Sequence, residues 1–189
     1  MHSIEPFFSW ADLYTAAEDS RSPFFNREYS EFEFTDHLYD HVLHPQWDNM
    51  GSPTLFIKIL YVDYEIGFSV IELIGEWNDL LHNDIMTLKR DIVELLMAEG
   101  INKFALIGEN VLNFHYSDDE YYAEWFDDIE EGWIIGLNFR DHVIAEMQNA
   151  QIDYYINLGG SFQDTNWRKF SPPSLFYHLN QLVTKRLQA

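Results

Sequence analysis

The sequence contains no cysteine, and this absence excludes disulfide bonds, thiolate metal sites and cysteine-based catalysis. Because disulfides belong to oxidising compartments, we expect a reducing, cytoplasmic location. The first residues include acids and no basic stretch before an apolar run, so we expect no secretory signal. Runs of about 20 apolar residues, the length that a membrane-spanning helix needs, are also missing.

Basic residues are scarce: 11 Lys and Arg face 32 Asp and Glu, which gives a net charge of −21. A surface this negative repels phosphate groups, so nucleic acid and anionic membranes are not expected partners. A basic protein suits the charge better. Glycine-rich phosphate loops and the nucleophile elbow of hydrolases are absent as well. Because no strong catalytic signature is present, the sequence leaves open whether the protein is an enzyme.

What the sequence does contain is a repeated strand pattern around one helix. The stretch Phe68–Asn110 reads FSVIELIGEW, then an amphipathic run, then NKFALIGEN. Two apolar strands that flank one helix form a βαβ unit, in which the strands are parallel neighbours. Both strands close with the letters Leu-Ile-Gly-Glu, which we interpret as two strand ends with the same turn chemistry.

The remaining pattern predicts one α/β domain over residues 54–189. We expect a mixed, mainly parallel sheet of about five strands, in the order β-β-α-β-α-β-α-β-α, with helices covering it. The expected strands are 54–65, 68–77, 103–108, 133–139 and 152–158. The expected helices are 84–99, 117–131, 141–150 and one from residue 171 onward.

Residues 1–53 form an aromatic-rich extension, which we expect to pack on the sheet as part of the same fold. Within it, residues 29–34 alternate aromatic and polar side chains with strand period. Thr35 is a candidate N-cap for a helix that ends near Leu43, before Pro45. The extension could instead serve as a lid on a ligand pocket or as a homodimer interface. Ordinary core packing is the interpretation that we favour.

The order of elements over roughly residues 54–158 is similar to that of STAS domains, the anti-sigma-factor-antagonist type. Their strand–Gly–Glu stretch before the first helix resembles Ile71–Glu76. The family's Asp-Ser-Ser/Thr-Gly phosphorylation turn is absent, and Asn113–Asp119 stands in its place. Ser117 is the only hydroxyl candidate there, and a helix cap explains it better. The resemblance therefore concerns element order and does not establish membership.

Polar residues follow several of the expected strands, and they define a candidate catalytic rim. Glu76 and Glu109 end the two strands of the βαβ unit, and Arg140 and His142 follow the next strand. Side chains on neighbouring strand ends lie about 5–10 Å apart. Two carboxylates this close have different pKa values, which suits an acid and a base. His142 would relay a proton, and Arg140 would hold an anionic substrate. The alternative to a catalytic rim is that these residues are polar only because the strand ends are exposed to solvent.

Three histidines, His37, His41 and His44, fall on one stripe if residues 35–43 form a helix. Three neutral imidazoles on one stripe are a candidate site for Zn²⁺ or Ni²⁺. No carboxylate shares the stripe, and a solvated helix face is the default interpretation.

The expected helix 117–131 carries eight acids, which predict either a solvated face or a docking surface for a basic protein. Our leading hypothesis is accordingly a non-enzymatic, regulatory or protein-interaction domain. The first alternative is a small hydrolase or isomerase with an acid/base site at the carboxyl ends of the strands. The second alternative is a divalent-metal binder that uses the histidine stripe.

Overall fold

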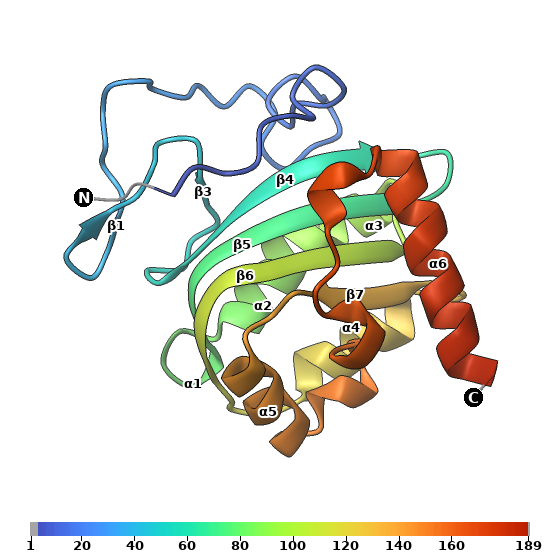
Figure 1. Ribbon diagram of the computed structural model, residues 1–189. Coiled ribbons are helices and arrows are strands. Elements are labelled where there is room, and N and C mark those ends of the chain that lie inside the picture. Colours follow the sequence, from blue (N-terminus) through green and yellow to red (C-terminus); the bar gives the residue numbers. More distant parts are fainter. Residues whose placement is uncertain (1–3, 189) are drawn as a thin grey trace.

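A mixed sheet carries helices on both of its faces (Figure 1). The computed structural model describes residues 4–188. Its strands are β1 (His37–Leu38), β2 (His41–Val42), β3 (Asp48–Asn49), β4 (Leu55–Asp63), β5 (Phe68–Asn78), β6 (Lys103–His115) and β7 (Trp133–Leu137). Its α-helices are α1 (Asp79–His82), α2 (Asp84–Leu88), α3 (Glu94–Ala98), α4 (Glu120–Asp128), α5 (Asp141–Asn149) and α6 (Pro172–Gln188). A π-helical turn η1 (Lys89–Val93) joins α2 to α3, and 3₁₀ turns are η2 (Ile152–Tyr154), η3 (Gly160–Phe162) and η4 (Trp167–Lys169).

Within residues 4–188, the central sheet has five strands in the order β3-β4-β5-β6-β7. β4 pairs antiparallel with both β3 and β5. The pairing with β5 is antiparallel because only a tight turn connects β4 to β5. β5, β6 and β7 run parallel, and a helical crossover precedes each new parallel strand. The expected mixed α/β sheet is therefore confirmed, although parallel pairings do not outnumber antiparallel ones in this part of the chain.

The prediction of a strand at residues 152–158 is wrong. The fifth strand of the sheet is instead the short β3, which lies at the other edge beside β4. Ile152 begins the 3₁₀ turn η2, and Asn157 makes only an isolated bridge to Ile135. Apolar residues at every second position suggested a strand, but Tyr154 is 73% exposed while Ile152 and Ile156 are buried. Burial four residues apart follows from a helical turn rather than from an extended strand.

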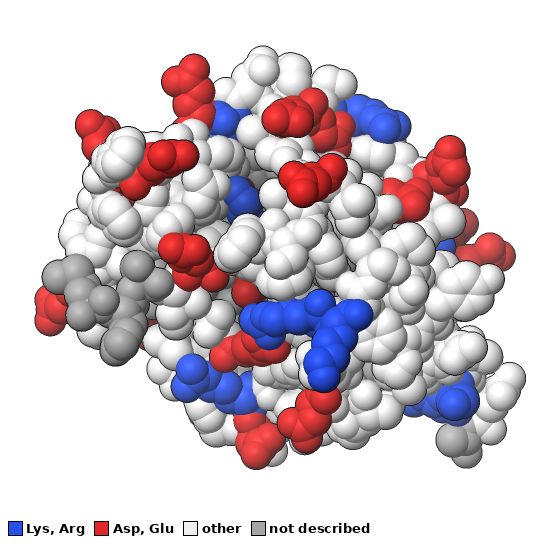
Figure 2. Space-filling view, turned by 45° about the horizontal axis from the view of Figure 1, so that its top comes forward, with Lys and Arg blue, Asp and Glu red and all other residues white. Residues whose placement is uncertain are grey.

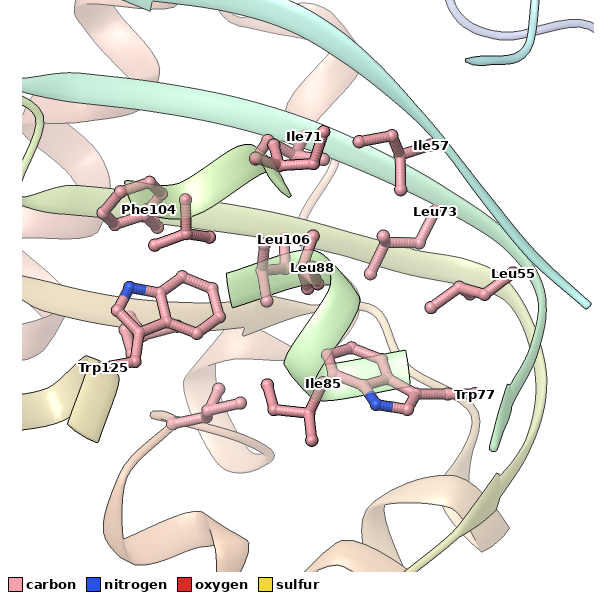
Figure 3. Packing of buried hydrophobic residues seen from close by; sticks show 14 of the residues in the cluster. Leu55, Ile57, Ile71, Leu73, Trp77, Ile85, Leu88, Phe104, Leu106 and Trp125 are labelled. Carbon is pink, nitrogen blue, oxygen red and sulfur yellow. The ribbon is translucent and has the colours of Figure 1, made fainter. Parts of the chain in front are cut away.

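The main core lies between one face of the sheet and the helices α2, α3, α4 and α5. Figure 3 shows Leu73 of β5 facing Ile85 and Leu88 of α2, with Trp77 and Trp125 beside them. These five side chains are at most 1% exposed. Full burial of each such side chain contributes about 1.5–3 kcal/mol, so this layer supplies much of the driving force for folding.

The second core lies on the opposite face, which α6 covers (Figure 1). Leu175, Leu179 and Val183 of α6 are spaced at helical intervals and pack with Val70 and Ile135 of the sheet. The sheet is thus apolar on both faces, as expected for parallel strands covered by helices. None of the helices in the described residues is long and apolar enough to cross a membrane.

The N-terminal segment lies beyond the β4 edge of the sheet (Figure 1) and reaches both cores. Trp10 packs in the α6-side core, whereas Ala16 and Phe24 join the core on the other face. The helix expected from Thr35 to about Leu43 is wrong: this stretch contains the short β1–β2 hairpin. Its turn places Tyr39 at φ +53°, a conformation that ends any continuous helix.

Candidate functional site

The two rim glutamates lie inside their strands and occupy separate sites. β5 continues to Asn78 and β6 continues to His115, beyond the ends expected from the sequence. Glu76 is in register with Asn113, four residues past Glu109, which corresponds to about 13 Å along the strand. Glu76 contacts the last residue of β6 instead, since its Oε1 lies 2.7 Å from His115 Nε2. The geometry therefore does not bring the two glutamates together as an acid/base pair.

Glu109 is the centre of a polar cluster on the α6 side of the sheet. Its Oε1 accepts hydrogen bonds from Trp167 Nε1 at 2.8 Å and from Asn138 Nδ2 at 3.0 Å. Its Oε2 lies 2.7 Å from Nη2 of Arg168. Burial alone would raise the pKa of Glu109, but the hydrogen bonds from Arg168, Asn138 and Trp167 outweigh burial and lower it. Glu109 is therefore ionised at neutral pH.

Glu72 of β5 lies on the same side and completes the cluster. Its side chain is only 2% exposed, and its Oε1 lies 4.0 Å from Nη2 of Arg168. Its Oε2 accepts a hydrogen bond of 2.8 Å from the backbone N–H of Phe7. Burial raises the pKa of Glu72 from 4.5 to about 7, although the Phe7 N–H and Arg168 act in the opposite direction. Glu72 therefore exchanges its proton near neutrality.

Glu72 and Glu109 form a pair whose environments push their pKa values apart, which is the pattern of a proton donor beside a proton acceptor. Aromatic rings enclose Glu72, whereas the Glu109 side chain is 25% exposed. The Phe7 ring lies 4.9 Å from the Trp167 ring, and the Trp10 ring lies 5.7 Å from it. The backbone of Phe7 also occupies one carboxylate oxygen of Glu72. In this arrangement the cluster joins the N-terminal segment to the sheet and leaves no open place for a substrate at Glu72.

A second carboxylate cluster lies where β5 meets α2. Asp79 accepts hydrogen bonds from Trp77 Nε1 at 3.0 Å, from the Tyr122 hydroxyl at 2.6 Å and from the Ile85 N–H at 2.8 Å. Burial raises the pKa of Asp79 to about 6 despite these donors. Because the Ile85 N–H belongs to the first turn of α2, Asp79 caps that helix. The side chain of Asn83, the residue that directly precedes α2, makes no such bond.

The other two rim residues contact the backbone of β6. Arg140 Nε donates to the carbonyl oxygen of Glu109 at 3.3 Å. His142 Nε2 lies 2.7 Å from the carbonyl oxygen of Leu112. Both residues thus hold the start of α5 against β6. A proton relay from His142 to either rim glutamate has no support in this geometry.

The histidine stripe depended on a helix that does not form. His37 and His41 belong to the β1–β2 hairpin, where they pair with Val42 and Leu38 respectively. His44 Nε2 lies 3.4 Å from Oε1 of Glu5. Across residues 4–188, no three His, Asp or Glu side chains are grouped closely enough to hold a metal ion. The geometric basis for the expected Zn²⁺ or Ni²⁺ site is therefore lost.

The acids of α4 are partly committed to the fold. Lys89 is buried, and its Nζ lies 2.8 Å from Asp128 Oδ2 and 3.4 Å from Glu124 Oε1. The Asp119 carboxylate accepts a hydrogen bond from the Tyr155 hydroxyl at 2.6 Å. These contacts tie α4 to η1 and to the segment after α5. The other two acids of α4, Glu120 and Asp127, are exposed and form no ion pair with residues 4–188.

Sequence reasoning missed Glu72, Arg168 and Asp79. A signal for Glu72 was available, because a charged residue inside the apolar strand FSVIELI must be buried and must find partners. Arg168 lies between the expected strand 152–158 and the expected final helix, and nothing in its spacing connects it to Glu109, 59 residues away. Only the tertiary structure brings it there.

No model of a known protein family matches the chain, and no curated protein matches it. The likeness to STAS domains concerned element order alone, and the strand expected at residues 152–158 is not formed in the structure.

Proposed function

We propose that the protein is a non-enzymatic binding protein that docks a basic protein partner through the segment Glu31–Thr35. One observation carries the proposal: this segment is exposed along its whole length although it alternates acids with phenylalanines. Phe32 is 86% exposed, and Phe34 is 41% exposed. Exposed aromatic side chains with a polar rim are typical of binding surfaces, where they fill apolar pockets of a partner.

The charge of the molecule supports a basic partner. Glu31 and Glu33 flank the two phenylalanines, and the whole chain carries a net charge of −21. On the face that Figure 2 shows, Asp and Glu are spread over the surface, whereas Lys and Arg gather in a few places. An acidic surface accelerates and orients the approach of a basic protein, and it repels a second copy of the same chain.

The carboxylate clusters favour binding over catalysis as the main function. Glu72 is enclosed. The polar side-chain atoms of Glu76, Glu109 and His142 contact other groups of the fold. In the proposed arrangement, the residues after 53 form most of the α/β scaffold, to which the N-terminal segment adds β3, and this segment also presents the binding residues. The absence of cysteine suits a reducing cytoplasm, where we place this function.

Capture followed by reconstituted binding tests the proposal. The immobilised protein should retain basic proteins from a native lysate at low salt, and a retained protein is then purified for affinity measurements. The double variant Phe32→Ser/Phe34→Ser should bind that protein at least about tenfold more weakly, because central aromatic anchors carry most binding energy. Added salt should also weaken the wild-type complex.

The control variant is Tyr177→Ser, which removes a ring that is 70% exposed on α6, far along the chain from the segment. It should bind the purified partner as the wild type does. The proposal fails if retention is insensitive to salt, or if the double variant and the wild type bind the partner equally.

A further inference from the structure

A pocket of about 380 Å³ lies between the β1–β2 hairpin and the middle of the sheet. It is separate from the enclosed Glu72 cluster and from the segment Glu31–Thr35. Its walls come from Leu38 and Leu43 near the hairpin, Ile74 of β5 and Leu112 of β6, and Arg140 lies at its border. The size falls within the usual range of small-molecule sites.

The walls of the pocket are apolar. Leu38, Leu43 and Ile74 are buried at 5–6% exposure and form one small hydrophobic cluster with Trp47 and Phe56. The apolar side chains that line this cavity have no van der Waals partners on the cavity side. An apolar ligand in the cavity would provide these partners. The walls therefore suit an aliphatic chain.

One end of the pocket is polar and positively charged. Arg140 is exposed, and no carboxylate of residues 4–188 lies within 4.0 Å of its guanidinium. Its single hydrogen bond to that part of the chain uses Nε, so the two Nη groups are available. The Asn110 amide, which also lines the pocket, makes no hydrogen bond within the described residues.

We propose that this pocket binds an aliphatic monocarboxylate, with its carboxylate on Arg140 and Asn110 and its chain against Leu43, Ile74 and Leu112. A guanidinium matches a carboxylate with two parallel hydrogen bonds. A neutral hydrocarbon would make no hydrogen bond with the Nη groups of Arg140 or with the Asn110 amide. A cationic ligand is repelled by Arg140, and a dianionic phosphate ester faces stronger repulsion from the acidic molecule.

Calorimetric titration with decanoate tests the proposal. The wild type should show saturable binding of one decanoate, and Arg140→Gln should weaken it at least about tenfold, because the charge-assisted contact is lost. Arg140 is exposed, but its Nε contacts the Glu109 carbonyl oxygen, so the circular dichroism spectrum and melting temperature of Arg140→Gln are compared with those of the wild type before the titration. Lys185→Gln makes the same change in net charge on exposed α6 and should bind decanoate as the wild type does. The methyl NMR signals of Leu43, Ile74 and Leu112 should shift during the titration.

Three outcomes contradict the proposal. The first is equal weakening by Arg140→Gln and Lys185→Gln, which would mean that only overall charge matters. The second is binding of decylammonium or decanol as tight as that of decanoate, because the carboxylate would then make no contribution. The third is tighter binding of a short peptide with a C-terminal leucine carboxylate than of decanoate, which would identify a chain terminus as the occupant instead.

Discussion

The buried carboxylate of Glu72 links the N-terminal segment to the sheet. It lies among apolar strand residues, accepts the Phe7 N–H and faces Arg168 at 4.0 Å. The Phe7 N–H and Arg168 do not compensate for the removal of the Glu72 carboxylate from water. Burial therefore raises the pKa of Glu72 to about 7. The charge of this one residue therefore affects the stability of the whole molecule.

The first prediction concerns the pH dependence that Glu72 imposes. Its pKa is 4.5 when unperturbed and about 7 in the folded protein, so between these values the folded state holds a proton that the unfolded state has lost. Stability should fall as the pH rises through this window, by about 3 kcal/mol in total. Glu72→Gln lacks the ionisation, so in urea denaturation it should match the wild type near pH 4.5 and exceed its stability near pH 8.

Glu65→Gln provides the matched control, because Glu65 is exposed at the β4–β5 turn. It should reproduce the wild-type slope of stability with pH. Parallel slopes for wild type and Glu72→Gln would show instead that the Glu72 carboxylate is ionised throughout this range.

At the scale of elements, the two Leu-Ile-Gly-Glu stretches look alike in sequence and serve different purposes. Gly75 has φ +117°, and a Cβ there would lie 2.0 Å from the Thr54 carbonyl oxygen. That carbonyl accepts the Glu76 N–H at 2.8 Å, so Gly75 shapes the pairing of β5 with the start of β4. Gly108 needs no special φ, but its missing side chain leaves room for the Phe139 ring.

The second prediction is that Gly75→Ala destabilises the protein by at least about 3 kcal/mol, because it combines backbone strain with a backbone clash. Gly160→Ala is the matched control: its φ is also positive, at +56°, but a Cβ there meets open space. It should cost only about 1 kcal/mol. Chemical denaturation of both variants gives the comparison. Equal losses would show that the Thr54 carbonyl moves aside at little cost.

At the scale of the whole molecule, the net charge of −21 opposes the compact state through self-repulsion. Few local ion pairs offset it, since basic residues are a third as numerous as acids. The third prediction is that raising NaCl from about 0.01 M to about 0.5 M increases the melting temperature by about 5 °C, because salt screens the long-range repulsion.

A variant with less charge should respond less to salt. Asp127→Asn, Glu130→Gln and Glu131→Gln together neutralise three exposed acids at the end of α4. The rise in melting temperature with NaCl should be smaller in this variant than in the wild type. A melting temperature that falls with salt would mean that local pairs such as Lys89 with Asp128 outweigh the general repulsion.

Patterns that depend on neighbours along the chain predicted structure well. The apolar runs of β4 and β5 with a short turn require a hairpin, and the spacing of Leu175, Leu179 and Val183 requires a helix face. The segment before residue 54 was less predictable. Trp10 and Phe24 are placed by contacts with the cores on the two faces of the sheet, so local periodicity there had little influence on the backbone.

The sequence by itself determined the α/β class, the amphipathic helices and the strongly acidic surface, because these follow from composition and from spacing along the chain. Only the tertiary structure decided which charges meet. Glu109 met Arg168 and Trp167 rather than Glu76, since long-range packing sets such contacts and strand register separates the two glutamates. The same packing buried Glu72, closed it with Phe7 and left Arg140 free beside an apolar pocket.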